Sequence, residues 1–382
     1  MYSVSSYGRM IADSVRMDAY TQALRRVIEP NSIVLDIGTG TGIFAMLACQ
    51  FGARRVYAVE PDDAIQVARE AAAANGYSER IEFIQSSSTE VTLSERADVI
   101  ISDLRGILPL FQHHISSIAD ARQRLLAPGG KLIPHRDTLW AAVVETPDLY
   151  RQHIAYSDDN NYGLDMEAGQ RIAANTWHKG RVTPEQLLVE PQCWGTLAYS
   201  EVENPNISAE LKWTVARAGT AHGISAWFDT VLVEGVGFSN APGMPELIYG
   251  NAFFPWLKPV KLADGDTVSV ALHANLVGED YIWRWETRVE EQGDSSRIKA
   301  DFKQSTFYGV PLSPARLRKQ STTHVPTLNE SGQIDRFILS LMNGDNSVGE
   351  IARALSERFP HKFIGWPEAL NRVSELSKNY SR

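Results

Sequence analysis

Apolar residues recur along the first third of the chain in two alternating patterns. Short continuous apolar runs of strand length are separated by longer segments whose apolar positions follow helical spacing. The predicted strands are 32–37, 56–59, 81–85, 97–102 and 131–134, and the helices between them are 43–49, 62–75 and 109–126. This alternation predicts an α/β doubly wound parallel sheet, with its ligand at the carboxyl ends of the strands. Two short helices are expected before the first strand.

The pattern changes after residue 134. Short β-branched and aromatic runs, such as TLWAAVVE and DTVSVALHA, then alternate with turn residues up to about residue 312, which predicts an antiparallel β domain. A Pro- and Ser-containing linker follows, and the segments 335–342, 347–359 and 367–376 read as three amphipathic helices. We therefore expect three domains, over residues 1–134, 135–312 and 325–382.

Three alternating glycines, Gly38, Gly40 and Gly42, follow the first predicted strand at once. Glycine permits positive φ at such a turn, and it lets an adenosyl ligand approach the backbone where a Cβ would block it. The second predicted strand ends at Glu60, where a doubly wound sheet places an acidic residue against ribose hydroxyls. The stretch therefore predicts a nucleoside site.

The spacing and charge of this turn distinguish between nucleotide ligands. A dinucleotide turn reads GxGxxG and offers a helix N-terminus to a pyrophosphate, whereas these glycines alternate as GxGxG. Asp36 lies just before the first glycine, where a carboxylate would repel a diphosphate and attract an ammonium group. S-adenosylmethionine carries an ammonium and a sulfonium and has no phosphate, so it is the predicted cofactor. A nicotinamide or flavin cofactor, or a turn without a ligand, are the alternatives.

Composition narrows the function classes further. The net charge of -9 argues against general nucleic-acid binding, which requires clustered Lys and Arg. Two cysteines make neither a disulfide framework nor a metal knuckle, so no metal site is expected. The sequence has no signal-peptide segment and no apolar run of membrane length, which predicts a cytoplasmic protein without a membrane partner.

The N-terminal motifs resemble those of the protein arginine methyltransferase family. The resemblance rests on Met10, Asp13, Arg16 and Tyr20, followed by VLDIGTGTGIFAMLACQFGA. It implies that Arg16 holds the cofactor carboxylate and that Met10 packs near the sulfonium. In that family the loop after the third strand flanks the adenine, which makes Ser88 and Thr89, with Glu90, candidates for cofactor binding.

The resemblance continues to about residue 290. AWFDTVL and NAFFPWLKPVKLADGDTVSV are similar to the β-barrel of that family, and YGLDM at 162–166 matches the start of its dimerisation arm, which implies a homodimer. The last segment, ILSLMNGDNSVGEIARALSERF, is similar instead to PqqD-like, winged-helix peptide-binding units. A carrier, leader-peptide or protein-partner role follows from that likeness, and a plain stabilising appendage is the alternative.

The substrate loop departs from the family. The family holds a guanidinium with two glutamates, whereas SDLRGILPLFQ has Asp103 at the first position and the neutral Gln112 at the second. Loss of the second carboxylate should cost about 1.5–3 kcal/mol of guanidinium binding. The family's Thr-His-Trp loop falls on Leu247, Ile248 and Tyr249.

These departures point to an acceptor that need not be arginine. We predict N-methylation of a peptide or small-molecule acceptor, such as a neutral amine or imidazole, with Asp103 as the first candidate base and His113 or His114 as the second. Arg105 would bind an acceptor carboxylate, and Tyr249 would lie in the acceptor site. The alternative is a catalytically silent S-adenosylmethionine-binding adaptor or regulatory protein.

Overall fold

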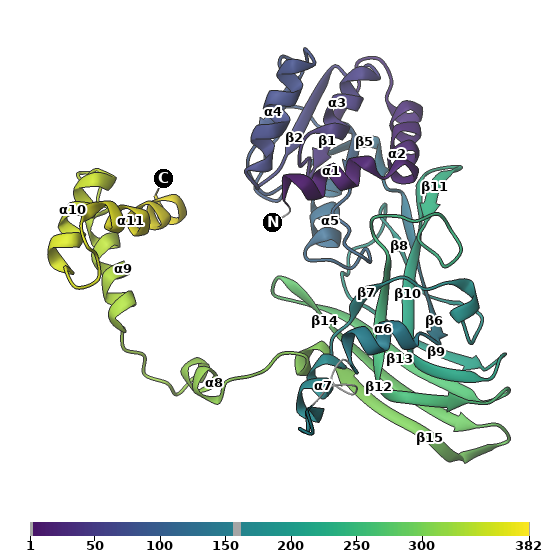
Figure 1. Ribbon diagram of the computed structural model, residues 1–382. Helices are drawn as coiled ribbons and strands as arrows, with labels where there is room; N and C mark the ends of the chain where they lie inside the picture. The colour runs from purple at the N-terminus through teal and green to yellow at the C-terminus, as the bar shows by residue number, and fades with distance from the viewer. Residues whose placement is uncertain (1–2, 156–161, 382) are drawn as a thin grey trace. The chain divides into compact units, whose positions relative to one another are not determined.

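The computed structural model describes residues 3–155 and 162–381. Contacts divide the chain into two compact units, residues 1–311 and 312–382 (Figure 1). The first unit contains both the parallel sheet and the antiparallel β domain. Each unit is described by itself.

The first unit begins with the predicted parallel sheet and its helices. The strand order is β3-β2-β1-β4-β5, and every neighbouring pair is parallel. Because the chain runs outward from β1 through β2 to β3 and then returns to β4 on the other side, the loops after β1 and β4 meet at a topological switch point. The strands are β1 (Ile33–Ile37), β2 (Arg55–Val59), β3 (Ile81–Ile84), β4 (Ala97–Ser102) and β5 (Leu126–Ile133), and the helices are α1 (Val4–Ala12), α2 (Ser14–Val27), α3 (Ile43–Gln50), α4 (Ala64–Ala74) and α5 (His114–Arg124).

Two predicted boundaries in this domain were wrong. Helix α5 begins at His114 and not near Pro109, because residues 103–113 form the irregular segment between β4 and α5. Strand β5 begins at Leu126, so the Pro-Gly-Gly sequence lies inside it. The pairing of β4 with β5 jumps from Leu126 to Lys131 at that point, which is a local irregularity rather than a turn between two elements.

Two antiparallel sheets follow. The first has the order β7-β12-β10-β6-β8, with β11 paired to β10, and the second has the order β15-β14-β13-β9. The predicted antiparallel domain is therefore confirmed, and its strands form two sheets. The strands are β6 (Arg136–Val144), β7 (His178–Gly180), β8 (Gln192–Ala198), β9 (Ile207–Thr214), β10 (Gly219–Val233), β11 (Val236–Ser239), β12 (Asn251–Leu262), β13 (Thr267–Val277), β14 (Asp280–Glu291) and β15 (Asp294–Ser305), with short helices α6 (Pro147–His153), α7 (Glu167–Ala173), η1 (Pro184–Gln186) and η2 (Thr306–Tyr308).

One hydrophobic core joins the parallel and antiparallel parts. Helix α2 packs against β10 and β11, and its buried Tyr20 contacts the ring of Phe238 on β11. Buried aromatic side chains lie between the two antiparallel sheets: the ring of Phe254 on β12 contacts those of Trp283 and Trp285 on β14. The parallel sheet and the β domain therefore share one core through α2.

The second unit is a small helical domain. It contains α8 (Pro314–Gln320), α9 (Glu330–Leu341), α10 (Val348–Arg358) and α11 (Trp366–Tyr380). The last three match the predicted amphipathic helices and bury Ile338, Leu355 and Val373 in a core of their own. Helix α8 lies within the segment predicted as a linker. Over the described residues 312–381 no strand occurs, so the wing of a winged-helix unit is not found there.

No described helix combines the length and apolar character that a membrane crossing requires.

Candidate functional site

The glycine loop after β1 has the backbone that the sequence predicts. Gly38, Gly40 and Gly42 all adopt positive φ, at 72°, 53° and 83°. A Cβ on Gly38 would lie 2.3 Å from Leu104 Cδ2, and one on Gly40 would lie 2.4 Å from a ring carbon of Tyr7. Glycine is favoured at both positions because of the positive φ, and a Cβ would in addition force the Leu104 and Tyr7 side chains to shift.

Glu60 lies at the carboxyl end of β2 and faces the same loop. Its two carboxylate oxygens accept hydrogen bonds of 3.0 Å from the amides of Gly40 and Asp62. Burial raises the pKa of Glu60 above its usual value, against these two hydrogen bonds. The amide of Gly40, 20 residues earlier in the sequence, thus holds the Glu60 carboxylate against the glycine turn.

Asp36, at the end of β1, is buried and accepts a 2.6 Å hydrogen bond from the hydroxyl of Thr39. Burial raises the pKa of Asp36 to about 7, and the Thr39 hydrogen bond only partly opposes this shift. The side chain therefore organises the glycine loop and titrates near neutral pH.

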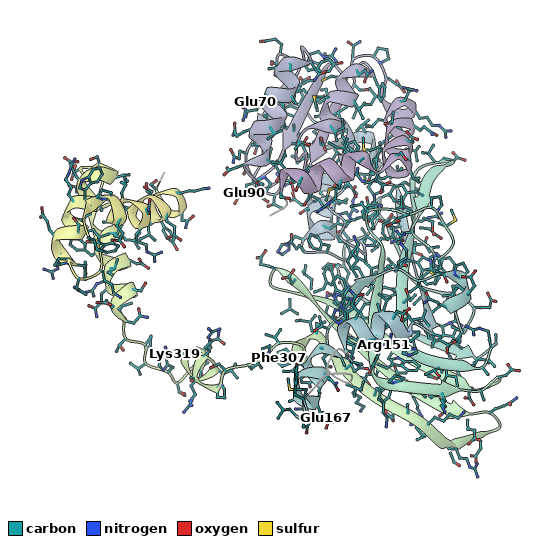
Figure 2. All side chains as sticks on the ribbon, in the orientation of Figure 1. Glu70, Glu90, Arg151, Glu167, Phe307 and Lys319 are labelled. Carbon is teal, nitrogen blue, oxygen red and sulfur yellow. The ribbon has the colours of Figure 1, made fainter. Side chains whose placement is uncertain are left out.

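The polar loop after β3 is held by a single arginine. Arg124 of α5 donates to the carbonyl oxygens of Ser88, Thr89 and Val91 at 3.0, 3.1 and 2.9 Å. Ser88 is buried and Thr89 is exposed. Glu90 is exposed and is labelled in Figure 2. The loop is therefore ordered at the carboxyl edge of the sheet, as a loop flanking a nucleobase would need to be.

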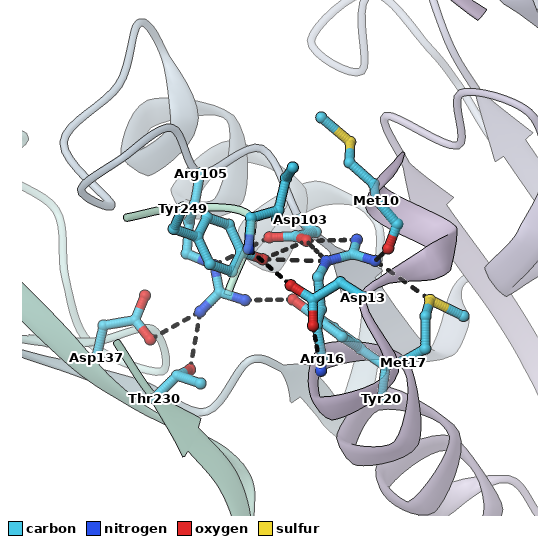
Figure 3. Close-up of polar contacts among 11 residues, drawn as sticks. Met10, Asp13, Arg16, Met17, Tyr20, Asp103, Arg105, Asp137, Thr230 and Tyr249 are labelled. Carbon is cyan, nitrogen blue, oxygen red and sulfur yellow. Dashed lines mark hydrogen bonds and ion pairs between the residues drawn. The ribbon is translucent and has the colours of Figure 1, made fainter. Parts of the chain in front are cut away.

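Arg16 of α2 is buried between Met10 and the loop after β4. Asp13 caps α2 by accepting from the Arg16 amide, and the Arg16 side chain then turns toward the loop after β4. Its Nη1 donates to the Met10 carbonyl at 3.1 Å and to Met17 Sδ at 3.2 Å. Met10 and Arg16, which sequence reasoning paired, are thus brought together (Figure 3).

Asp103 is paired on both sides. Its Oδ2 accepts from Arg16 Nη2 at 2.6 Å and Arg16 Nε at 2.7 Å, and its Oδ1 accepts from Arg105 Nε at 3.0 Å (Figure 3). The Tyr249 hydroxyl donates to Oδ2 at 2.7 Å. Burial opposes ionisation, but the two guanidinium groups and this hydroxyl hold the pKa of Asp103 well below its usual range. In this arrangement Asp103 is a structural anion and a weak base.

Arg105 does not present its guanidinium to a ligand site, which differs from its predicted role. Its side chain is 0% exposed. Beyond Asp103, it donates to Asp137 Oδ1 at 3.0 Å, to the Thr230 hydroxyl at 2.8 Å and to the Tyr20 hydroxyl. Arg105 therefore joins the parallel sheet to β6 and β10.

Gln112, His113 and His114 diverge in their surroundings. Gln112 has φ of 43° and is exposed, as is His113, whose Nε2 lies 3.1 Å from Glu279. The described contacts of both residues lie outside the Asp103 cluster. His114 is buried and lies 2.9 Å from the Tyr199 hydroxyl, and burial lowers the pKa of His114 to about 3. His114 is therefore neutral and structural.

The loop at 247–249 closes the cluster from the β domain. The Ile248 amide donates to Asp13 at 2.7 Å, and Tyr249 packs parallel to Phe238 with centroids 5.8 Å apart. Burial raises the pKa of Tyr249 well above its usual value, and Asp103 adds to the shift, so the phenol stays protonated. Tyr249 thus lies beside Asp103.

Sequence reasoning missed three members of the ion network around Asp103 and Arg105, namely Asp137, Thr230 and Tyr199. They form its far side together with Tyr20, which the sequence singled out only as part of the N-terminal motif. The Tyr199 hydroxyl donates to Asp137 at 2.7 Å. Asp137 at the start of a predicted apolar strand was the one available signal, because a carboxylate in a buried strand requires a cationic partner.

The fold and this site define a class of protein: an S-adenosylmethionine-dependent methyltransferase domain followed by an antiparallel β domain. Residues 19–134 match the family described as ribosomal protein L11 methyltransferase (PrmA), and residues 135–288 match the arginine methyltransferase oligomerization subdomain. "Protein arginine N-methyltransferase PRMT10" of Oryza sativa subsp. japonica is 30% identical over 301 residues, covering 69% of this chain and 78% of that protein. The chain belongs to the protein arginine methyltransferase family, whose members use S-adenosylmethionine.

A second relative is similar in sequence, and two solved structures are similar in fold. "Probable protein arginine N-methyltransferase 6" of Arabidopsis thaliana is 32% identical over 251 residues, which span 63% of this chain and 56% of that relative's length. The fold resembles Arabidopsis thaliana protein arginine methyltransferase 10, with a TM-score of 0.68, 24% identity and coverage of 79% and 97% of the two chains. It also resembles the Trypanosoma brucei PRMT1 enzyme-prozyme heterotetrameric complex with AdoHcy, with a TM-score of 0.70, 22% identity and coverage of 78% and 96%.

Proposed function

We propose that the protein transfers a methyl group from S-adenosylmethionine to a nitrogen of a peptide or small-molecule acceptor that need not be arginine. The observation that carries this proposal is the pairing of Asp103 with Arg16, Arg105 and Tyr249. A guanidinium acceptor would require a free carboxylate, and this one already has two cationic partners.

The cofactor role is assigned residue by residue. Gly38 and Gly40 would allow the adenosyl group to approach the backbone, and Glu60 would accept from the ribose hydroxyls. Asp36 would attract the ammonium group and Arg16 the carboxylate. Ser88 and Thr89 would flank the adenine, and Met10 would lie near the sulfonium.

When bound, S-adenosylmethionine supplies a methyl group on positively charged sulfur, which is open to in-line displacement. The protein's contribution is positioning, since alignment of the reacting atoms supplies most of the rate in such a transfer. A neutral nitrogen needs no counter-charge and would attack the methyl group with its own lone pair. Tyr249 would line the acceptor site without donating to that nitrogen, because its one hydroxyl hydrogen is given to Asp103. A neutral amine or imidazole fits these requirements best.

The test begins with calorimetric titration of S-adenosylmethionine and its demethylated product. Glu60→Ala should weaken cofactor binding roughly 10- to 100-fold, because it removes charge-assisted hydrogen bonds of about 1.5–3 kcal/mol. Glu60→Gln is the matched control, because it keeps the size of the side chain and removes the charge. Its cofactor affinity should lie between those of wild type and Glu60→Ala. Labelled methyl transfer is then screened on histidine-containing, amine and arginine-containing peptides and small molecules. Transfer to a non-guanidine nitrogen is expected, and transfer to arginine alone would contradict the proposal.

A silent adaptor is the second candidate function. It is favoured by one observation: Asp103 is fully paired while His113 and Gln112 lie exposed elsewhere, so the described site holds no evident base. Micromolar cofactor binding without transfer to any acceptor class would support the adaptor.

We also propose a homodimer formed through the segment that follows residue 161. Tyr162, Leu164 and Met166 are apolar and 85%, 63% and 45% exposed. Light scattering should give twice the chain mass, and Leu164→Asp should shift the protein toward monomer. A monomeric wild type would contradict this.

A further inference from the structure

Arg105 occupies a site whose every wall suits a guanidinium. Four of its five N–H donors are matched: Nε by Asp103, both Nη1 hydrogens by Asp137 and Thr230, and Nη2 by the Tyr20 hydroxyl (Figure 3). Two carboxylates therefore hold one planar cation from two directions, which is the recognition that a guanidinium fork allows and a point charge does not.

Aromatic rings complete the enclosure, which we call the Arg105 cage. The Arg105 Cζ lies 5.4 Å from the ring centroids of both Phe228 and Phe238, and 5.8 and 5.9 Å from those of Tyr249 and Tyr20. These distances lie within the range of cation–π attraction, and the contacts are desolvated because the arginine is fully buried. The cage is drawn from α2, the loop after β4, β6, β10, β11 and the loop at 247–249.

The cage shares its first carboxylate with the cofactor side of the site. Asp103 Oδ1 faces Arg105, and Asp103 Oδ2 faces Arg16, the residue proposed to hold the cofactor carboxylate. A cation bound in the cage is therefore adjacent to the place where an acceptor must lie. The position of the chain's own guanidinium there satisfies the carboxylates before any substrate arrives.

We infer that Arg105 is a built-in occupant of a guanidinium-binding cage and thereby determines acceptor specificity, excluding arginine side chains by taking their counter-charges. The specificity part rests on the proposed function. The cage itself does not, since it predicts a binding property that is independent of methyl transfer. A site that needed only a positive charge would accept ethylammonium as readily as ethylguanidinium.

The test uses the full-length Arg105→Ala variant and ethylguanidinium, whose heavy atoms correspond to those that the substitution removes. Thermal unfolding and calorimetric titration are measured without cofactor. Ethylguanidinium should raise the melting temperature of Arg105→Ala and bind it at least roughly tenfold more tightly than ethylammonium, which has the same charge without the planar fork. Wild type and Arg105→Met, in which the space is filled without charge, should not respond.

Equal responses to ethylguanidinium and ethylammonium, or an equal response of wild type, would overturn the inference. If Arg105→Ala does not fold alone, refolding with ethylguanidinium should recover folded protein, and failure to recover it would also count against the cage. Arg105→Lys is an independent test. Its melting temperature should be lower than that of wild type and should not change with ethylguanidinium. If it melted at the wild-type temperature, the cage would not distinguish a planar guanidinium from a point charge. Failure of methyl transfer in the wild type would remove the proposed function and leave these binding results intact.

Discussion

The cofactor edge and the acceptor loop of this protein lie side by side but are built differently. At the cofactor edge, one short stretch supplies Asp36, the glycines and Glu60, and backbone amides of the same stretch hold the carboxylate. In the acceptor loop, Asp103 and Arg105 are held by side chains up to 146 residues away in sequence. The first region depends on backbone amides that are close in sequence, whereas the second is an internal ion network of side chains that are far apart in sequence.

The charged groups around a buried carboxylate decide its chemistry. Asp103 begins the loop after β4, and its contacts with Arg16, Arg105 and Tyr249 make it an anchor between the parallel sheet and the β domain. The chemistry of the loop is therefore determined by what surrounds the carboxylate.

The largest effect should come from breaking the network at its centre. Asp103→Asn keeps the shape but leaves Arg16 and Arg105 short of a buried counter-charge, which should lower the free energy of unfolding by about 3–5 kcal/mol. Because the pKa of Asp103 lies well below its usual range, the difference should persist at pH 4. Urea unfolding measures it.

Asp120→Asn is the matched control for that experiment. Asp120 pairs with Arg124 at 2.6 Å, but this pair is partly exposed on α5, so its loss should cost less than about 1 kcal/mol. Equal losses in the two variants would mean that the Asp103 network is no more important to the fold than a surface pair.

A smaller effect is expected from titration of the cofactor edge. If the ionised form of Asp36 attracts the cofactor ammonium, affinity should rise roughly tenfold between pH 6 and 8, as a group with a pKa of about 7 ionises. The stability of the cofactor-free protein should move the other way. A carboxyl whose pKa rises on folding, here from 3.8 to about 7, loses its stabilising contribution as pH increases across that window.

Calorimetry at several pH values and thermal unfolding over the same range measure the two trends. Asp36→Asn should remove the pH dependence of both the cofactor affinity and the stability. It should also bind the cofactor more weakly than wild type at pH 8. A wild-type affinity that is constant from pH 6 to 8 would show that Asp36 only organises the turn through Thr39.

The smallest effect should come from restoring the family's second glutamate. Gln112 is exposed, so Gln112→Glu should change the free energy of unfolding by less than about 0.5 kcal/mol. It should also produce no transfer to arginine peptides in a labelled methyl assay, because Asp103 remains paired with Arg105. Appearance of arginine methylation in this variant would place the specificity at position 112.

Much of the fold could be predicted from the sequence because its signals are local. A buried strand, three glycines and a helix in direct succession specify the turn after β1, and the spacing to Glu60 follows from one crossover of a parallel sheet. The β domain was predicted equally well, since β-branched and aromatic runs between turns have few alternatives. The start of α5 was predicted too early because residues 109–113 continue the apolar pattern without adopting a helix.

The tertiary structure alone decided what the acceptor loop does. No pattern in residues 102–114 distinguishes His113, which is exposed, from its neighbour His114, which is buried against Tyr199. Nor does it pair Arg105 with Asp137, because side chains from different domains meet only once the core between α2, β10 and β11 has formed. The sequence by itself determined the sheet, the glycine turn and Glu60, since these depend on neighbouring residues and backbone geometry. Burial and long-range charge pairing, which set the protonation and availability of Asp103, Arg105 and His114, belong to the folded molecule.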